Sequence, residues 1–265
     1  MTNPKERIDV MLNRPSRVKK WLSIVIVAFL VIWSFGYTGF SLADLMYGLP
    51  QMGELIKAMV PPSWSYFSVI WEPMLDTIRM AIVGTFIGAI LSIPISLLCA
   101  RNITTLLWLS WPMRLILNIV RTIPELLLAA LFVAVVGIGQ IPGVMAIVVL
   151  TVSIVSKLMY ESLEGIEPGP LEAMTAVGCN KVTQITYGVV PQALPTYLSY
   201  VLYAFEINIR AAAVLGLVGA GGIGLFYDRT LGLFQYPQTA VIILLTLLIV
   251  ILIDFISSRV RERLL

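Results

Sequence analysis

Residues 126–156 read LLLAALFVAVVGIGQIPGVMAIVVLTVSIVS, a run of thirty-one residues without a charged side chain. A membrane-spanning helix needs about 20 apolar residues, so this run is too long for one span. Two glycines, a glutamine and a Pro-Gly pair interrupt it at 137–143, and these residue types favour a turn. The run therefore predicts two membrane helices joined by a tight turn.

The whole chain shares this apolar character. Its 265 residues are 58% hydrophobic and 12% charged, with a mean hydropathy of +0.92. An ordinary globular domain has about 25% charged residues, so there is too little polar surface here to cover a soluble particle. Four further apolar stretches bring the predicted number of spans to six: Trp21–Tyr37, Ala81–Ala100, Val189–Phe205 and Tyr236–Ile253. We expect an all-α polytopic membrane bundle of six transmembrane helices, embedded in a lipid bilayer.

The positions of Lys and Arg predict the orientation, because cations in short loops stay on the cytoplasmic side. Both ends of the chain are rich in cations, as are the loops after the second and fourth predicted spans, so both termini are expected in the cytoplasm. The net charge of +3 gives no reason to expect nucleic acid as a partner. The predicted layout is a cytoplasmic tail at 1–20, a transmembrane helix at 21–37, an external loop at 38–76, a transmembrane domain at 77–257 and a cytoplasmic tail at 258–265.

A glycine-rich stretch follows the fifth predicted span. Residues 211–227 are uncharged and long enough to cross a membrane, but a seventh span would send the arginine-rich C-terminus outside. We expect a re-entrant or broken segment, in which small residues permit close backbone approach at a gate or between two copies of the chain. The glycines are Gly216, Gly219, Gly221, Gly222 and Gly224. Three of them have the spacing G-x-G-x-x-G, which we attribute to chance because no βαβ pattern surrounds them.

Two absences restrict the chemistry. The chain has no histidine, which excludes His-based acid/base catalysis and His-ligated zinc, and its two cysteines cannot form a metal cluster. The chain contains no G-x-x-x-x-G-K-[ST] motif, the P-loop that holds the phosphates of ATP. If ATP supplies energy to this protein, another chain must bind it. We expect no metal, cofactor or catalytic residue here, and a membrane-embedded transferase or protease is the less favoured class.

The loop between the fourth and fifth predicted spans carries the strongest functional signal. It reads ESLEGIEPGPLEAMTAVG over 161–178, and Pro170, Glu172 and Gly178 suit the start, the first turn and the end of a short helix. We predict this helix at 168–178, on the cytoplasmic side. Its apolar residues recur at three-residue spacing and share one face, which either fills a groove on a partner or packs against the chain itself. They are Leu171, Met174 and Val177.

This loop resembles the EAA loop of ABC-transporter permeases, in which E-A-A is followed by three residues, G, nine residues and I-x-L-P. The chain keeps Glu172, Ala173, Gly178 and Pro191, and has Met174, Gly188 and Val190 where the family has Ala, Ile and Leu. The resemblance implies that Pro170–Gly178 docks on a cytoplasmic ATPase and transmits its closure to the pathway. That partner would bind ATP and Mg.

Three further strings resemble the phosphonate-import branch of type I ABC permeases: RTIPELLLA at 121–129, FEINIRAAAVLG at 205–216 and GAGGIG at 219–224. The resemblance implies a bacterial plasma-membrane importer of phosphonate or a related phosphorus oxyanion, with an ABC ATPase dimer and an extracytoplasmic substrate-binding protein. A second permease copy is expected, with a heterodimer as the alternative. Phosphate, phosphite or an amino acid such as methionine are alternative substrates, and a channel or carrier without an ATPase is the alternative mechanism.

Two charged pairs lie at the ends of predicted spans. In each pair the residues are four apart, so each pair can close an ion pair on one helix face. Pairing alone explains such charges; the functional alternative is a guanidinium near the outer mouth that attracts an anion. Because a pore must bind weakly, selectivity is expected mainly in the binding protein. The pathway candidates are Arg121, Glu125, Glu206, Asn208 and Arg210.

Overall fold

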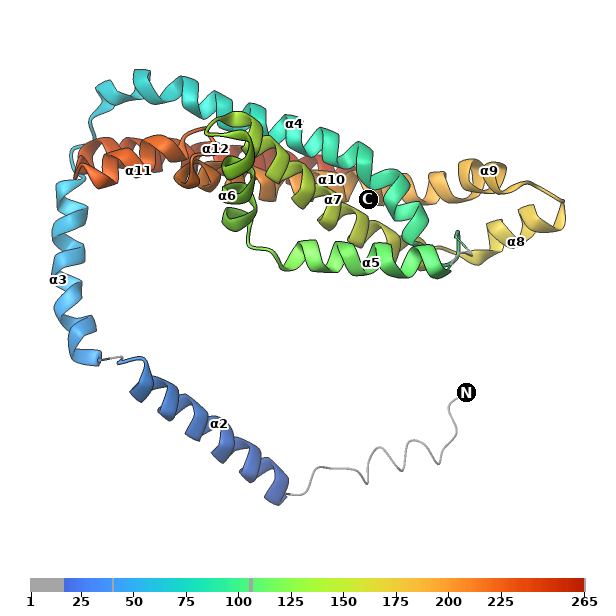
Figure 1. Ribbon diagram of the computed structural model, residues 1–265, viewed down its shortest axis with the longest axis horizontal. Coiled ribbons are helices and arrows are strands. Elements are labelled where there is room, and N and C mark those ends of the chain that lie inside the picture. The colour runs from blue at the N-terminus through green and yellow to red at the C-terminus, as the bar shows by residue number, and fades with distance from the viewer. Residues whose placement is uncertain (1–16, 40, 105–106, 265) are drawn as a thin grey trace. The chain divides into compact units, whose positions relative to one another are not determined.

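The computed structural model describes residues 17–39, 41–104 and 107–264. All regular elements within these ranges are helical, which confirms the all-α class (Figure 1). The chain divides into two units, residues 1–57 and 58–265. Of the predicted tail at 1–20, only the last four residues fall within the described ranges.

The described part of the first unit contains two helices. Helix α2 (Arg17–Tyr37) covers the predicted transmembrane helix at 21–37 and is long and apolar enough to cross a membrane. Helix α3 (Leu42–Ala58) occupies much of the region predicted as an external loop, so that region is largely helical. The sequence interpretation missed α3 because two glycines and Pro50, residues with poor helix propensity, lie inside it.

The second unit is built around four long helices: α4 (Phe67–Cys99), α7 (Gln140–Glu164), α10 (Val190–Leu215) and α12 (Tyr236–Leu264). A single 3-10 turn, η1 (Trp64–Tyr66), precedes α4. Helix α4 begins at Phe67 and not at Ala81. Its first turns are mostly apolar, and the charged residues that follow them, Asp76 and Arg79, form an ion pair of 2.9 Å. Helix α12 likewise continues through the predicted C-terminal tail as far as Leu264.

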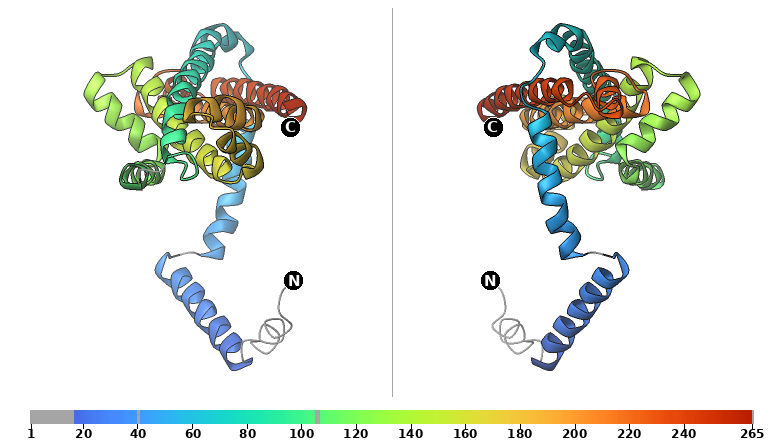
Figure 2. Two further views of the ribbon diagram at one scale, coloured as in Figure 1. Left: turned by 90° about the vertical axis from the view of Figure 1, so that its right-hand side faces the viewer. Right: turned by 90° about the vertical axis from the view of Figure 1, so that its left-hand side faces the viewer.

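The third predicted span, the first part of the run at 126–156, is only the second half of a bent pair of helices, and the first half lies in a region predicted as a loop. Helix α5 (Leu107–Thr122) and helix α6 (Glu125–Val136) meet at 95°, and α6 alone has only 12 residues (Figures 1 and 2). Pro124 lies at the bend, where it lacks the N–H that would continue the α5 ladder. Among the described residues, five helices are long and apolar enough to cross a membrane, and six spans result if the bent pair counts as one.

Helices α4 and α7 pack along a seam made by Gly84, Gly88, Ile147 and Thr151, which we call the α4–α7 seam. A Cβ atom added to Gly84 would lie 2.5 Å from Ile147 Cγ2, and one added to Gly88 would lie 2.5 Å from Thr151 Cβ. Only glycine therefore lets the two helices approach this closely. The spacing of the two glycines, G-x-x-x-G, was a signal for this contact that the sequence analysis did not use.

The turn between α6 and α7 confirms the break predicted within 126–156. Gly137 and Gly139 both have positive φ, and the Gly139 N–H donates to the Gly219 carbonyl at 3.0 Å. Beyond α10 the chain forms a 3-10 turn, η3 (Gly216–Val218), and a short helix, α11 (Gly224–Gly232). Residues 211–227 are thus a broken segment and not a seventh span.

Two short helices and a π-helical turn connect α7 to α10: α8 (Pro168–Ala176), α9 (Lys181–Gln184) and η2 (Ile185–Val189). In Figure 1, α8 and α9 lie at the end of the second unit where α4 ends and α5 begins, while α11 lies at the opposite end. The end of this unit that carries α8 and α9 and the end that carries α11 are therefore two separate surfaces.

Candidate functional site

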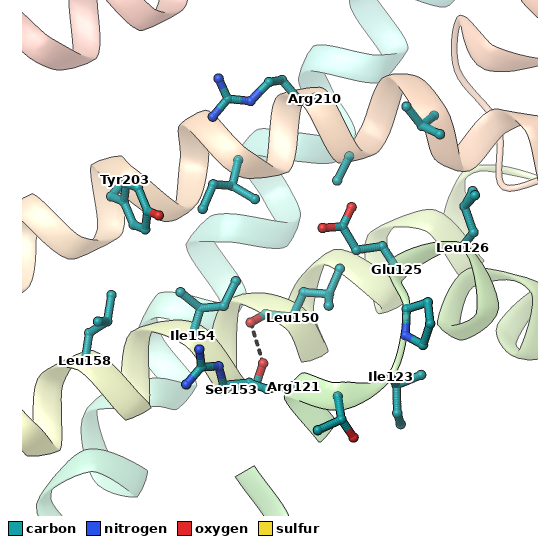
Figure 3. Close-up of a pocket in the computed structure, with 15 residues that line it drawn as sticks. Arg121, Ile123, Glu125, Leu126, Leu150, Ser153, Ile154, Leu158, Tyr203 and Arg210 are labelled. Atoms are coloured by element: carbon teal, nitrogen blue, oxygen red, sulfur yellow. Dashed lines mark hydrogen bonds between the residues drawn. The ribbon is translucent and has the colours of Figure 1, made fainter. Parts of the chain in front are cut away.

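A cavity of about 880 Å³ lies between the α5–α6 bend, α7 and α10. Three predicted pathway residues, Arg121, Glu125 and Arg210, line it together although they come from three different helix segments (Figure 3). Its other polar lining comes from Thr122, Ser153 and Tyr203. The structure thus joins residues that the sequence placed near opposite ends of separate spans.

The structure describes both Arg121 and Glu125, and these two residues do not form the predicted ion pair. The i,i+4 argument requires one continuous helix, but Pro124 ends that continuity between α5 and α6. Figure 3 shows the Arg121 guanidinium beside Ser153 and Ile154, while the Glu125 carboxylate extends toward α10. Both charges are therefore presented to the cavity separately.

The second predicted pair is present. Arg210 Nη2 lies 3.0 Å from Glu206 Oε1 on α10. The Arg210 side chain is 49% exposed and that of Glu206 only 15%. Glu206 therefore serves as the buried support of Arg210 and does not itself line the cavity.

Arg261 on α12 is a further member of this charge cluster that the sequence analysis missed. Its Nη2 lies 2.9 Å from Glu206 Oε2, so each Glu206 oxygen has its own arginine. One oxygen of the nearby Asp254 is buried without a hydrogen-bond partner. No spacing rule links residues 55 positions apart, and Arg261 lay in a segment predicted as a solvated tail.

Asn208 does not line the cavity, although the sequence analysis grouped it with Arg210. It is fully buried, and its Nδ2 donates to Thr85 Oγ1 and Thr151 Oγ1, both at 2.7 Å. Asn208 thereby ties α10 to α4 and α7. A helix turns about 100° per residue, so a side chain two positions from Arg210 points to the opposite side.

The predicted glycines form a tight turn at the α11 end of the second unit. A Cβ on Gly216 would lie 2.6 Å from the Gly224 Cα, and a Cβ on Gly222 would lie 2.6 Å from Thr77 Oγ1. The Ile223 N–H also donates to Thr77 Oγ1 at 2.8 Å. The remaining glycines of the set, Gly219 and Gly221, both have positive φ. These contacts lie within one chain and hold the segment against α4.

Helix α8 confirms the short helix predicted in the loop after α7. Gly178 follows its C-cap with φ +76°, and the Cys179 N–H donates to the Met174 carbonyl at 3.0 Å, so the helix ends in a Schellman motif. Pro168 and Pro170 both lie in its first turn.

The apolar face of α8 is turned mostly toward its own chain, which corrects one of the two sequence interpretations. Leu171 and Met174 are half-buried, and their side chains lie within about 3.1 Å of the position that a Cβ of Gly188 would take. Val177 is exposed, and so are Glu172 and Ala173. The exposed surface at α8 includes five of the predicted coupling residues: Pro170, Glu172, Ala173, Val177 and Gly178.

The cavity combines two arginines and one carboxylate on a mainly aliphatic wall. Such a wall can attract an anion through guanidinium N–H donors. Within the described part of the chain, no three Cys, Asp or Glu residues are grouped so that they could hold a metal ion. The arrangement suits passage of a charged solute.

The fold and the cavity define the class: a multi-pass membrane protein that forms a path for a solute. Residues 92–265 match the family described as binding-protein-dependent transport system inner membrane component. The chain belongs to this family, and it is a permease subunit of a type I ABC importer.

Similar proteins place the chain within one branch of the family. It is 34% identical over 240 residues to the phosphite transport system permease protein of Stutzerimonas stutzeri, covering 90% of this chain and 87% of that protein. It is also 34% identical over 224 residues to the phosphate-import permease protein of Mycolicibacterium smegmatis, covering 84% and 42%. The inward-facing MetNI methionine ABC transporter shares the fold, with a TM-score of 0.65 at 22% identity, over 74% of this chain and 96% of that one.

Proposed function

We propose that two copies of this chain form the path by which an ABC importer carries phosphite, a phosphonate or a related phosphorus oxyanion across a bacterial plasma membrane. The names of the similar permeases support this substrate class. The observation that carries the proposal is that the half-exposed Arg210 is among the residues that line the 880 Å³ cavity. A guanidinium offers paired N–H donors that match oxyanion geometry.

Arg210 is suited to passing an anion on without retaining it. One of its terminal nitrogens is bonded to Glu206, so the carboxylate offsets part of the positive charge, and its other N–H donors make no hydrogen bond with the residues that the structure describes. Glu125, on the opposite wall, adds a negative charge that opposes tight anion binding. Weak binding is what a transport path needs, because a tightly held solute is not released.

Energy would come from a cytoplasmic ATPase dimer that binds ATP and Mg and contacts α8. The exposed residues Glu172, Ala173 and Val177 would form that contact, with Leu171 and Met174 anchoring α8 to the rest of the chain. In this arrangement both termini are cytoplasmic, and an extracytoplasmic binding protein delivers the anion at the α11 end. Closure of the ATPase would move α8 and turn the cavity between inward and outward access.

The test is uptake by proteoliposomes that contain this permease, its ATPase and its binding protein. Radiolabelled phosphite and methylphosphonate are offered with ATP inside the vesicles. Arg210→Gln is expected to abolish uptake while the complex still assembles, and Arg210→Lys is expected to retain part of it because the charge remains but the paired donors are lost.

Arg263→Gln is the matched control, since it removes one exposed arginine from the end of α12, and Arg263 does not line the cavity. Unchanged uptake by Arg210→Gln would remove Arg210 from the path. If the wild-type vesicles carried neither phosphite nor methylphosphonate but did carry another solute, the proposed substrate class would be wrong.

A further inference from the structure

Helix α5 exposes an apolar stripe that ends in two tryptophans. Trp108 is 77% exposed and Trp111 66%, and Leu115 and Ile119 continue along the same helix face. We call these four residues the α5 stripe. Tryptophan is enriched where a membrane protein meets the headgroup region, and aliphatic residues contact the acyl chains. The stripe therefore has the pattern of a surface that crosses from headgroups into hydrocarbon.

A second cavity, of about 410 Å³, lies at the tryptophan end of the stripe. Arg101, Trp108, Ser110, Trp111 and Arg114 line it. None of these residues lines the 880 Å³ cavity, so the two cavities are separate.

Arg114 is fixed in place by its own chain. Its Nε donates to the Cys99 carbonyl at 2.9 Å, it forms an ion pair with Glu164, and its guanidinium lies 4.3 Å from the centre of the Tyr160 ring. These contacts make it a rigid part of the cavity wall. Ser110 and Arg114 lie on the buried side of α5, so the wall is anchored to the bundle while the tryptophans face outward.

Arg101 differs from Arg114 because its guanidinium is exposed, although Glu164 lies near both arginines. Its backbone N–H donates to Glu164 at 3.0 Å, but its exposed guanidinium makes no hydrogen bond or ion pair with the residues that the structure describes. An exposed guanidinium beside a fixed one, at a cavity lined by two indoles, suits an anionic ligand with an apolar part.

We propose that Arg101, Arg114 and the two tryptophans bind the headgroup of an anionic phospholipid, with its acyl chains along Leu115 and Ile119 of the α5 stripe. The site lies at the same end of the unit as α8, next to the end of α4 (Figure 1). A lipid fits better than a free phosphate ion because the exposed stripe continues the site along the helix. Basic sites at the ends of membrane helices recognise anionic headgroups by this combination of charge and apolar surface.

Native mass spectrometry of the full-length chain tests the proposal. The delipidated protein is mixed with phosphatidylglycerol or with phosphatidylcholine of the same acyl chains, and retained lipid is counted. The wild type should retain phosphatidylglycerol preferentially, and Arg101→Gln should weaken that retention about fivefold, the effect of removing one cation near an anionic lipid. Arg101→Gln removes no side-chain bond made by the described residues, so the fold should be unaffected; an unchanged melting temperature checks this.

Two controls separate the possible ligands. Arg229→Gln, which removes an arginine at the opposite end of the unit, should leave retention unchanged. Inorganic phosphate at millimolar concentration should not displace the lipid; displacement would indicate a site for a soluble anion and overturn the proposal. Equal retention by Arg101→Gln and wild type would overturn it as well.

A second readout uses the tryptophans themselves. Phosphatidylglycerol with brominated acyl chains should quench tryptophan fluorescence more than brominated phosphatidylcholine. The difference should disappear in the Trp108→Phe, Trp111→Phe double variant. A difference of unchanged size in that variant would place the lipid elsewhere and contradict the proposed site.

Discussion

One side of α7 packs against α4 with no room for an additional carbon atom, whereas another side of the same helix faces a cavity of about 880 Å³. Ile147 and Thr151 belong to the α4–α7 seam, while Ser153 and Ile154 line the cavity. Asn208 strengthens the closed side by bonding to both α4 and α7. The helix thus has one side committed to the fold and one available for the solute.

The difference indicates which parts can move during transport. A close-packed interface resists small shifts, so α4 and α7 should behave as one body. The opposite wall of the cavity is formed by the α5–α6 bend, where Pro124 interrupts the backbone ladder. Movement that opens or closes the cavity is therefore expected at this bend, and substitutions on the two sides of α7 should have different consequences.

The largest effect is expected from Gly84→Leu in the α4–α7 seam. The added side chain would overlap Ile147, which should lower the free energy of unfolding by about 1–3 kcal/mol or more. The yield of monodisperse protein and its melting temperature measure this. Gly53→Leu in α3 is the control, because a Cβ there meets nothing within 4 Å. A normal melting temperature for Gly84→Leu would show that the seam is not closed.

Asn208→Ala should have a smaller effect on the same side. It removes two interhelical hydrogen bonds, and such bonds in membranes contribute on average about 0.6 kcal/mol each, so a loss of about 1 kcal/mol is expected. Thermal unfolding of Asn208→Ala, Thr151→Val and the double variant measures the coupling between the two residues. Strict additivity would contradict the bond, and Asn118→Ala, an exposed amide on α5, provides the reference.

Arg121→Gln, on the cavity side, should change stability least. Its exposed side chain makes no ion pair with the described residues, so the free energy of unfolding should change by less than about 0.5 kcal/mol. Uptake of the anion should nevertheless fall, because the cavity loses one of its two arginines. Uptake and melting temperature are measured on the same preparation. If Arg121→Gln lowered the melting temperature but left uptake normal, the cavity side of α7 would serve stability and not transport, which is the opposite of what we expect.

Local signals in the sequence predicted the elements that depend on neighbouring residues. Prolines in the first turn and Gly178 at the end marked α8, and the i,i+4 spacing predicted the pair of Glu206 and Arg210. The same spacing failed for Arg121 and Glu125, because a helix periodicity holds only where the helix is unbroken. The sequence also could not decide that Leu171 and Met174 pack against their own chain near Gly188, because periodicity identifies an apolar face but not what covers it.

The sequence by itself determined that the chain is a helical membrane protein, that the run at 126–156 breaks at its glycines, and which family the chain resembles, because span length, hydropathy and turn residues act over a few positions. Only the tertiary structure decided that Arg121 and Arg210 share one cavity, that Asn208 is a packing residue and that Arg261 supports Glu206. These relations join helices that are far apart in the chain. Their geometry depends on bends and close approaches between helices, such as those at Pro124 and Gly84, that no local pattern specifies.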